Sequence, residues 1–293
     1  MSFDDPRDFL ARLEEEGDLI RISEPVDARF EISAYIRKTS DQQGPALLFE
    51  RVKGRDIPVV GGIFAARRRV LRALGFKSEE AVERFSQAAD HPIAPVLVDE
   101  GPCQEVVYEG DAVDLTRLPI PTYSPQDGGA FITHGIEITK DPETGEKNAG
   151  IYRMQLQGRN RLGIFANVQQ HCYIHYTKAE KKGEALEIAV ALGVDPVVML
   201  GTQVKAPYGT DELSVAGGLR GEAVPVVKCR TVDLEVPAMS EIVIEGRMLP
   251  GIREAEGPFG EFSGYYGPGD RRPVIEVSAV THRRSPIFHA GLT

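Results

Sequence analysis

The sequence predicts an α+β protein of two domains. In residues 1–95, segments with apolar residues at helical spacing alternate with short apolar segments typical of strands. Proline-rich stretches at residues 91–95 and 118–125 follow, and beyond them the two-residue period of strands dominates. A chain of 293 residues is long enough for two domains. We therefore predict a small α/β domain at residues 1–110 and a domain rich in antiparallel strands at residues 111–293.

The first domain begins with a helix that has a clear start signal. Asp5 followed by Pro6 is the usual pair of an N-cap and a first helical residue, and the apolar stripe that follows stops at Gly17. Ser78 is expected to cap a later helix that runs to Ala89. Between these helices we expect strands at residues 19–22, 46–52 and 57–61, and a helix at residues 31–38.

The second domain is expected to consist mainly of strands. We predict them at residues 131–139, 151–156, 162–168, 196–200, 224–230, 241–245 and 274–281, with a turn at 141–147 linking the first two. The segment 179–192 has helical character and is predicted to be a helix. The glycine-rich segment 209–222 is predicted to be a loop between strands.

Composition and charge exclude several classes of protein. The formal net charge of −10 argues against a protein that binds the phosphate backbone of nucleic acids. Cys103, Cys172 and Cys229 are odd in number and form no CxxC pair, so we expect neither a disulfide framework nor a thiolate zinc site. We see no export signal and no membrane span, and we expect a cytoplasmic protein. The basic run 67–69 is expected to lie on the solvent-exposed face of a helix.

Residues 251–267, GIREAEGPFGEFSGYYG, place Glu256 and Glu261 five residues apart. Glycine and proline make a helix or strand unfavourable here, so a loop is expected. The aromatic residues of the segment could desolvate a carboxyl group and raise its pKa toward that of a general acid. When the segment is considered alone, a surface turn with two solvated glutamates is the simpler explanation. The aromatic residues are Phe259, Phe262, Tyr265 and Tyr266.

Other polar residues of the second domain are candidates for ligand binding. Arg153 follows Asn148 on an otherwise apolar segment, where its guanidinium could hold a carboxylate or simply face outward. His171 and His175 lie four residues apart, but no HExxH pattern accompanies them. His171 could ligate magnesium or manganese together with an amide and a carboxylate, or it could be a structural histidine. The segment 209–222 supplies the carboxylates Asp211, Glu212 and Glu222.

Five segments in order carry a resemblance to a known family. They are NAGIYRMQ at 148–155, QQH at 169–171, DELSVAGGLRGE at 211–222, VVKCRTVDLEVPAMSEIVIEG at 226–246 and EGPFGEFSGYYG at 256–267. Together they resemble the UbiD family of decarboxylases, which use prenylated FMN and act on aromatic and α,β-unsaturated carboxylic acids. The N-terminal region resembles the leading domain of this family more loosely. The resemblance implies a split β-barrel of the flavin-reductase type for the second domain.

The resemblance also implies a set of ligands for the cofactor. Asn148, His171 and Glu212 would hold a divalent metal, usually manganese, that bridges to the cofactor phosphate. A potassium ion would lie nearby, held by the backbone of residues 201–204 and by Glu212. The residues implied to contact the cofactor or its metal are Asn148, Ala149, Gly150, Ile151, Arg153, Gln170, His171 and Glu212.

By the same resemblance, the catalytic residues are Arg153, Glu256 and Glu261. Glu261 would donate the proton, and Glu256 and Arg153 would form an ion-pair network that orients the substrate and tunes this acid. The implied reaction is the nonoxidative, reversible decarboxylation of an aromatic or enoic acid with release of carbon dioxide. A flavin prenyltransferase would supply the cofactor, and the full-length protein would be a homo-oligomer.

Family members are longer than this chain and carry a C-terminal domain, most or all of which we expect to be absent here. An alternative prediction is therefore a flavin-binding module without activity. A further alternative is a metal-dependent hydrolase that uses Glu256 or Glu261 as its base and needs no flavin.

Overall fold

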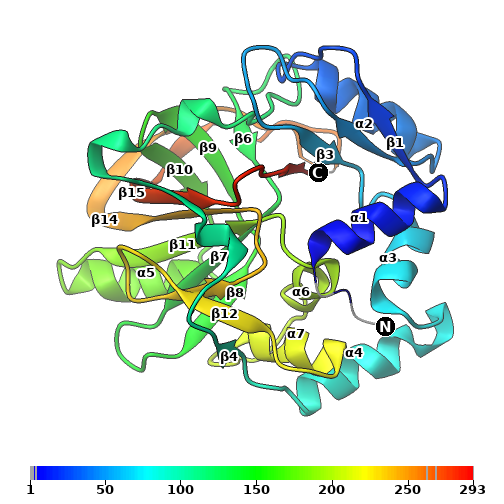
Figure 1. Cartoon of the computed structure of the whole chain (residues 1–293). Coiled ribbons are helices and arrows are strands. Elements are labelled where there is room, and N and C mark those ends of the chain that lie inside the picture. Colours follow the sequence, from blue (N-terminus) through cyan, green and yellow to red (C-terminus); the bar gives the residue numbers. More distant parts are fainter. Residues whose placement is uncertain (1–2, 4, 262, 268, 293) are drawn as a thin grey trace.

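The computed structural model describes residues 3, 5–261, 263–267 and 269–292. Phe262, one of the aromatic residues considered above, lies outside the described residues. The described chain forms three sheets with helices packed around them, which is the mixed α+β architecture expected (Figure 1). In this part of the chain no helix is both long and apolar enough to cross a membrane.

The first sheet contains four strands in the order β1-β2-β3-β16. Strands β1 and β2 are parallel, β2 and β3 are antiparallel, and β16 near the C-terminus pairs in parallel with β3 (Figure 1). The elements of this region are α1 (Pro6–Glu15), β1 (Leu19–Ile22), α2 (Glu31–Asp41), β2 (Ala46–Phe49), β3 (Val59–Gly61), α3 (Arg67–Leu74), a 3-10 turn η1 (Ser78–Glu80) and α4 (Ala81–Asp90), together with β16 (Phe288–Ala290).

Two expectations for this region need correction. Ser78 begins the turn η1 and does not cap the following helix, since Glu80 occupies the N-cap position of α4. Arg69 does not face solvent: its side chain is 1% exposed. Its guanidinium donates to Asp18 and to the backbone oxygens of Gly44, Gly62 and Ile63. Arginine can be buried when every N–H of its guanidinium group finds an acceptor.

The second sheet has nine strands and is antiparallel at every pairing. Its order is β6-β9-β10-β15-β14-β11-β7-β8, and β5 pairs with β15 beyond this path. The strands are β5 (Val106–Glu109), β6 (Phe131–Ile132), β7 (Gly135–Lys140), β8 (Lys147–Gly150), β9 (Arg153–Gly158), β10 (Arg161–Phe165), β11 (Leu186–Leu192), β14 (Ile242–Glu256) and β15 (Asp270–His282). Helix α5 (His171–Lys181) packs against β7, β11 and β14 (Figure 1). The flavin-reductase type of barrel stays a prediction.

A third sheet of three short strands has the order β13-β12-β4. Its strands are β4 (Val96–Leu97), β12 (Pro225–Lys228) and β13 (Glu235–Pro237). Helices α6 (Pro196–Gly201) and α7 (Glu212–Arg220) pack on each other, and α4 packs on α7. The remaining elements are the 3-10 turns η2 (Pro102–Gln104), η3 (Gly110–Ala112) and η4 (Leu115–Arg117).

Four predictions in the second region are wrong, in whole or in part, and one is too simple. The loop expected at 251–267 begins only after Glu256, because residues 251–256 continue strand β14 and residues 253–256 pair with β15. The segment predicted as a helix at 179–192 contains the end of α5 and the strand β11, the segment predicted as a strand at 196–200 is α6, and the loop predicted at 209–222 contains α7. The strand predicted at 131–139 is divided into β6 and β7.

The hydrophobic core joins elements from both ends of the chain. Ile32 of α2 and Phe49 of β2 belong to the same buried cluster as Ile132 of β6 and Ile244 of β14. Each of these residues is at most 1% exposed. A second cluster lies between the large sheet and the helices α6 and α7. The domain boundary at residue 110 stays a prediction.

Candidate functional site

The arginine and two glutamates singled out in the sequence meet where strand β9 begins and strand β14 ends. Arg153 is the first residue of β9, and Glu256 is the last residue of β14. The guanidinium of Arg153 donates two hydrogen bonds to the carboxylate of Glu256, from Nε at 2.9 Å and from Nη2 at 3.1 Å. Its Nη1 donates to Glu261. One guanidinium therefore holds both carboxylates.

The three side chains differ in their exposure to solvent. The side chain of Glu256 is 2% exposed and that of Arg153 is 13% exposed, whereas that of Glu261 is 35% exposed. Burial lowers the pKa of Arg153, but the hydrogen bonds and negative charges of Glu256 and Glu261 outweigh burial and raise it above its ordinary value. Arg153 therefore remains charged and can bind an anion or organise the two carboxylates.

A second arginine and an aromatic ring belong to the same group, and sequence reasoning missed both. The Cζ atom of Arg153 lies over the ring of Phe165, 4.2 Å from its centroid, and also 5.1 Å from the ring centroid of Phe259. The Cζ atom of Arg272 lies 4.4 Å from the centroid of Phe165. Nε of Arg272 is 3.7 Å from Oε2 of Glu256. Arg272 is placed here by the register of β14 and β15, which sets Glu254 opposite Arg272. A long connection separates these strands, so their register could not be read from the sequence.

The loop that carries Glu261 is held by close backbone contacts. A Cβ atom at Gly257 would lie 2.3 Å from the Cα atom of Gly128, so glycine at this point permits the approach of the two chains. Gly128 N–H donates to Pro258 O at 2.7 Å, and Gly257 N–H donates to Oε1 of Gln155 at 2.7 Å. Phe259 is buried, and its ring centroid lies 4.6 Å from that of Phe131. These contacts fix the segment between the two glutamates.

A second polar group forms where β8 meets the first residues of two helices. His171 begins α5 and Glu212 begins α7. Oε2 of Glu212 accepts a hydrogen bond of 2.7 Å from Ala149 N–H, and its Oε1 lies 3.6 Å from Nδ1 of His171. Asn148 is 3% exposed and precedes Ala149 in β8. The structure thus brings together the imidazole and the carboxylate proposed as metal ligands, and Asn148 adjoins the residue that donates to Glu212. The side-chain Nδ2 of Asn148 itself donates to the hydroxyl of Tyr152 at 3.5 Å.

The charge on this second group is poorly compensated. Burial raises the pKa of Glu212 to about 7 and lowers the pKa of His171. Among the described residues, no Lys or Arg forms an ion pair with Glu212. No cluster of three or more His, Cys, Asp or Glu residues suited to a metal occurs in the described part of the chain. A metal site here would therefore depend on the amide of Asn148 in addition to His171 and Glu212.

Two family models match this chain. The model described as "3-octaprenyl-4-hydroxybenzoate carboxy-lyase Rift-related domain" matches residues 96–293, and the model of the N-terminal domain of the same carboxy-lyases matches residues 10–89. The first match alone covers more than half of the chain. The chain belongs to the UbiD family.

Relatives in the UbiD family are similar along nearly the whole chain. An uncharacterized protein of Archaeoglobus fulgidus is 40% identical, over 99% of this chain and 64% of its own length. The evolved dimeric form of the UbiD-class enzyme HmfF from Pelotomaculum thermopropionicum, solved with prFMN, is 43% identical with a TM-score of 0.95, over 99% of this chain and 67% of that chain. The vanillic acid decarboxylase of Sedimentibacter hydroxybenzoicus in closed form is 32% identical with a TM-score of 0.95. The match covers 99% of this chain and 64% of that chain. The chain thus spans about two thirds of the length of these relatives.

The remaining residues proposed for cofactor binding lie between the two polar groups. Gly150 ends β8, and Ile151 and Tyr152 form a break before β9 begins at Arg153. A hydrogen bond to the neighbouring strand β7 stabilises this break: Tyr152 N–H donates at 2.7 Å to the carboxyl group of Glu137, which is 0% exposed. One short segment of this UbiD-family chain therefore carries both the arginine of the first group and the amide of the second.

Gln170 lies at the N-cap position of α5, directly before His171. Its Oε1 accepts a hydrogen bond of 2.6 Å from Asn167 N–H, which closes the turn that leads into the helix. Gly201 is the last residue of α6, and residues 202–204 follow it. A Cβ atom at Gly201 would lie 2.6 Å from Cα of Ala216 in α7. The segment proposed to hold potassium is therefore adjacent to the helix that Glu212 begins.

Proposed function

We propose that this chain is the cofactor-binding and catalytic part of a carboxy-lyase for the nonoxidative, reversible decarboxylation of an aromatic or α,β-unsaturated carboxylic acid. The observation that carries the proposal is the pairing of Arg153 with two carboxylates beside the ring of Phe165. The buried amide of Asn148 lies five residues earlier in the chain, and the backbone of the next residue, Ala149, donates to the buried Glu212, which faces His171. Membership of the UbiD family and the similarity to HmfF, which was solved with prFMN, support the proposal.

The residues present fit a prenylated FMN and its metal. Glu212 is a buried carboxylate with no cationic side chain beside it in the described structure, and a bound cation would offset the cost of burying its charge. An oxygen from an amide, an imidazole nitrogen and a carboxylate suit manganese or magnesium. Asn148, His171 and Glu212 would hold the divalent metal against the cofactor phosphate, and the backbone of residues 201–204 with Glu212 would hold potassium. When bound, the prenylated flavin supplies the electrophilic group that activates the substrate for loss of carbon dioxide.

The residues of the chain orient the substrate and deliver the proton. The guanidinium of Arg153 can attract the substrate carboxylate, and its bidentate contact with Glu256 fixes its direction. The rings of Phe165 and of the buried Phe259 lie beside the guanidinium of Arg153 and give this site an apolar surface, which limits access of water. Glu261 is the most exposed of the three charged groups and lies on a loop, so it is the residue we assign to proton donation.

The proposal includes partners. A flavin prenyltransferase would supply the cofactor, the substrate would be a small aromatic or enoic acid, and carbon dioxide would be released. We further propose a cytoplasmic location and a homo-oligomeric full-length protein, and the evolved dimeric form of HmfF supports the latter.

The first test is cofactor and metal content. The chain is co-expressed with a flavin prenyltransferase, purified, and analysed by absorbance, by intact mass of the released cofactor and by metal analysis. About one prenylated FMN and one divalent metal per chain are expected, and Glu212→Gln should reduce both. A folded chain that retains neither would overturn the cofactor assignment.

The second test separates activity from binding. Release of carbon dioxide from a panel of aromatic and enoic acids is measured for the loaded chain and for Glu261→Gln, with Glu254→Gln as the control from the same region. Turnover should be lost in Glu261→Gln although the cofactor is retained. Turnover in Glu261→Gln at the level of the unsubstituted chain would refute the assignment of the proton donor. A loaded chain that releases no carbon dioxide would favour the alternative of a flavin-binding module, which the relatives' greater length makes worth testing.

A further inference from the structure

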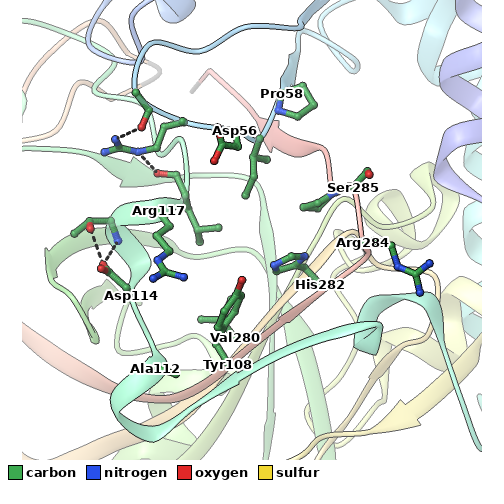
Figure 2. A pocket seen from close by; sticks show the side chains of 16 residues that line it. Asp56, Pro58, Tyr108, Ala112, Asp114, Arg117, Val280, His282, Arg284 and Ser285 are labelled. Carbon is green, nitrogen blue, oxygen red and sulfur yellow. Dashed lines mark hydrogen bonds between the residues drawn. The ribbon is translucent and has the colours of Figure 1, made fainter.

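A cavity of about 610 Å³ is lined by residues other than those of the group around Arg153 and Glu256. One wall is the loop before β3, with Ile57 and Pro58, another is the segment around η4, with Arg117, and a third follows the end of β15. Figure 2 shows Tyr108 and His282 on one side of the opening and Asp56 and Pro58 across from them. A volume of this size accommodates a small organic ligand.

The floor of the cavity is aromatic and apolar. Tyr108 of β5 and His282 of β15 lie with their ring centroids 5.7 Å apart and their planes inclined by 37°. Val280 is buried and lies opposite Tyr108 in the pairing of β15 with β5. Two neighbouring ring faces over a buried aliphatic base offer a planar ligand a stacking surface.

The charge around this floor is predominantly positive. The guanidinium of Arg117 lies over the ring of Tyr108, with 5.4 Å from Cζ to the centroid, and Arg55 and Arg284 also line the cavity. In the described structure, none of these three arginines forms an ion pair with a carboxylate; Arg55, for example, donates to the backbone oxygens of Gly54 and Leu118.

The acidic residues of the lining do not cancel this charge. Oδ1 of Asp114 accepts hydrogen bonds from the backbone N–H and the hydroxyl of Thr116, at 3.0 Å and 2.5 Å. Its Oδ2 faces Nε of Arg159 at 3.5 Å. Asp56 is the other acidic residue that lines the cavity, whereas three arginines line it. On a chain with a formal net charge of −10, this cavity is a local positive region.

The cavity is separate from the proposed catalytic group. Arg272, beside Glu256, and His282, in the cavity, are ten residues apart in the same strand β15. At ~3.3 Å per residue, a strand of that length extends roughly 30 Å. A ligand in the cavity therefore cannot touch Arg153 or its glutamates.

We propose that this cavity is a binding site for a planar aromatic anion, that is, a ring that bears a carboxylate or a phosphate. The ring stacks on Tyr108 and His282, and the anionic group pairs with the guanidinium of Arg117, which is already oriented over the same surface. The rim arginines Arg55 and Arg284 attract the anion into the cavity. The site does not depend on the proposed decarboxylation.

The test is isothermal titration calorimetry of the 293-residue chain at low ionic strength. Benzoate and adenosine monophosphate represent the two sources of the anionic group, benzamide and adenosine are their neutral counterparts, and inorganic phosphate lacks the ring. We expect saturable binding of at least one aromatic anion, whereas its neutral counterpart and inorganic phosphate bind about tenfold more weakly or worse. Which of benzoate and adenosine monophosphate binds decides between the carboxylate and phosphate forms of the ligand.

Variants locate the binding. Arg117→Gln and Tyr108→Leu should each weaken the binding about tenfold or more, because one removes the charge and the other the stacking surface. Arg12→Gln, which removes an exposed arginine of α1, should leave the binding unchanged. Thermal unfolding of each variant shows that it is folded. Unchanged affinity in both cavity variants would overturn the proposal, as would equal binding of the neutral compounds or no binding of either anion at ~10 mM.

Discussion

Glu256 should be one of the residues on which the stability of this region depends most, and Glu256→Gln tests this. The carboxylate is almost fully buried and accepts two hydrogen bonds from Arg153, with the guanidinium of Arg272 also near it at 3.7 Å. In the variant, the charge is removed and an amide N–H₂ faces guanidinium donors. Both arginines then lose a buried counter-charge.

The magnitude follows from these contacts. A hydrogen bond to a charged group contributes about 1.5–3 kcal/mol, and removing one partner of a buried ion pair costs about 3–5 kcal/mol. Arg153 keeps its contact with Glu261, and the amide keeps one acceptor oxygen, so the loss lies below the upper figure. We expect Glu256→Gln to lower the free energy of unfolding by about 2–3 kcal/mol.

The assay is urea unfolding followed by far-ultraviolet circular dichroism, since the chain contains no tryptophan. The matched control is Glu254→Gln, two residues earlier in β14, where a carboxylate that is 33% exposed pairs with Arg161. The control should change stability by less than about 1 kcal/mol. If the two variants differ by less than about 0.5 kcal/mol, the reasoning about the buried pair is refuted.

Three further substitutions test the fold around this region. Gly257→Ala should destabilise the chain by about 1–3 kcal/mol because the new Cβ would lie 2.3 Å from a facing backbone atom, whereas Gly158→Ala, with open space at its Cβ, should have little effect; equal unfolding midpoints in urea would contradict this. Arg69→Met should cost about 3–5 kcal/mol because buried acceptors lose their donors, whereas Arg72→Met, half exposed in the same helix, should cost less than about 1 kcal/mol; the same urea assay decides. The pKa of Glu180 is lowered to about 2 by hydrogen bonds from an arginine of β14, so its contribution to stability is present above the ordinary pKa of 4.5 and is lost as the pH falls toward 2; a stability difference between the chain and Glu180→Gln that is the same at pH 7 and pH 3 would refute this.

The sequence predicted elements well where local signals and tertiary packing agree. Asp5 and Pro6 begin α1 as expected, and the side chain of Asp5 accepts a hydrogen bond from Arg7 N–H. Residues 186–192 were misassigned because β11 lies in the middle of the large sheet and is buried on both faces. A strand of this kind lacks alternation, and the helix-favouring alanine and leucine of its sequence are overruled by pairing with β7 and β14.

The helices α6 and α7 were not predicted from the sequence, for two different reasons. Asp195 before Pro196 is the same start signal as that of α1, and Asp195 indeed accepts from the N–H groups of Val197 and Val198, so α6 could have been found. Helix α7 contains Gly217 and Gly218, which locally disfavour a helix. They are placed there by tertiary contact: Cβ atoms would lie 2.4 Å and 2.8 Å from backbone oxygens of the segment 88–93. No pattern in the sequence predicts that neighbour.

The charged residues of the site were easier to predict than the residues packed around them, because the sequence segments that resemble the UbiD family contain the charged residues. Arg153, Glu256 and Glu261 were chosen from two short segments, and the structure brings them together. Phe165 and Arg272 complete the same group, but they come from the ends of other strands. Their place depends on the order β9-β10-β15-β14 in the sheet, which is a property of the whole fold.

The two glutamates differ in the pairing of their backbone and in their exposure to solvent, and this difference supports the roles proposed for them. Glu256 ends a strand that is paired with β15 up to its last residue, so its carboxylate is fixed beside Arg153. Glu261 lies beyond the strand, and more than a third of its side chain reaches solvent, so it can exchange a proton between water and substrate. Removal of Glu256 should therefore impair both stability and turnover. Glu261→Gln should abolish turnover and change the free energy of unfolding by less than about 1 kcal/mol, and a larger loss of stability would assign Glu261 a structural role instead.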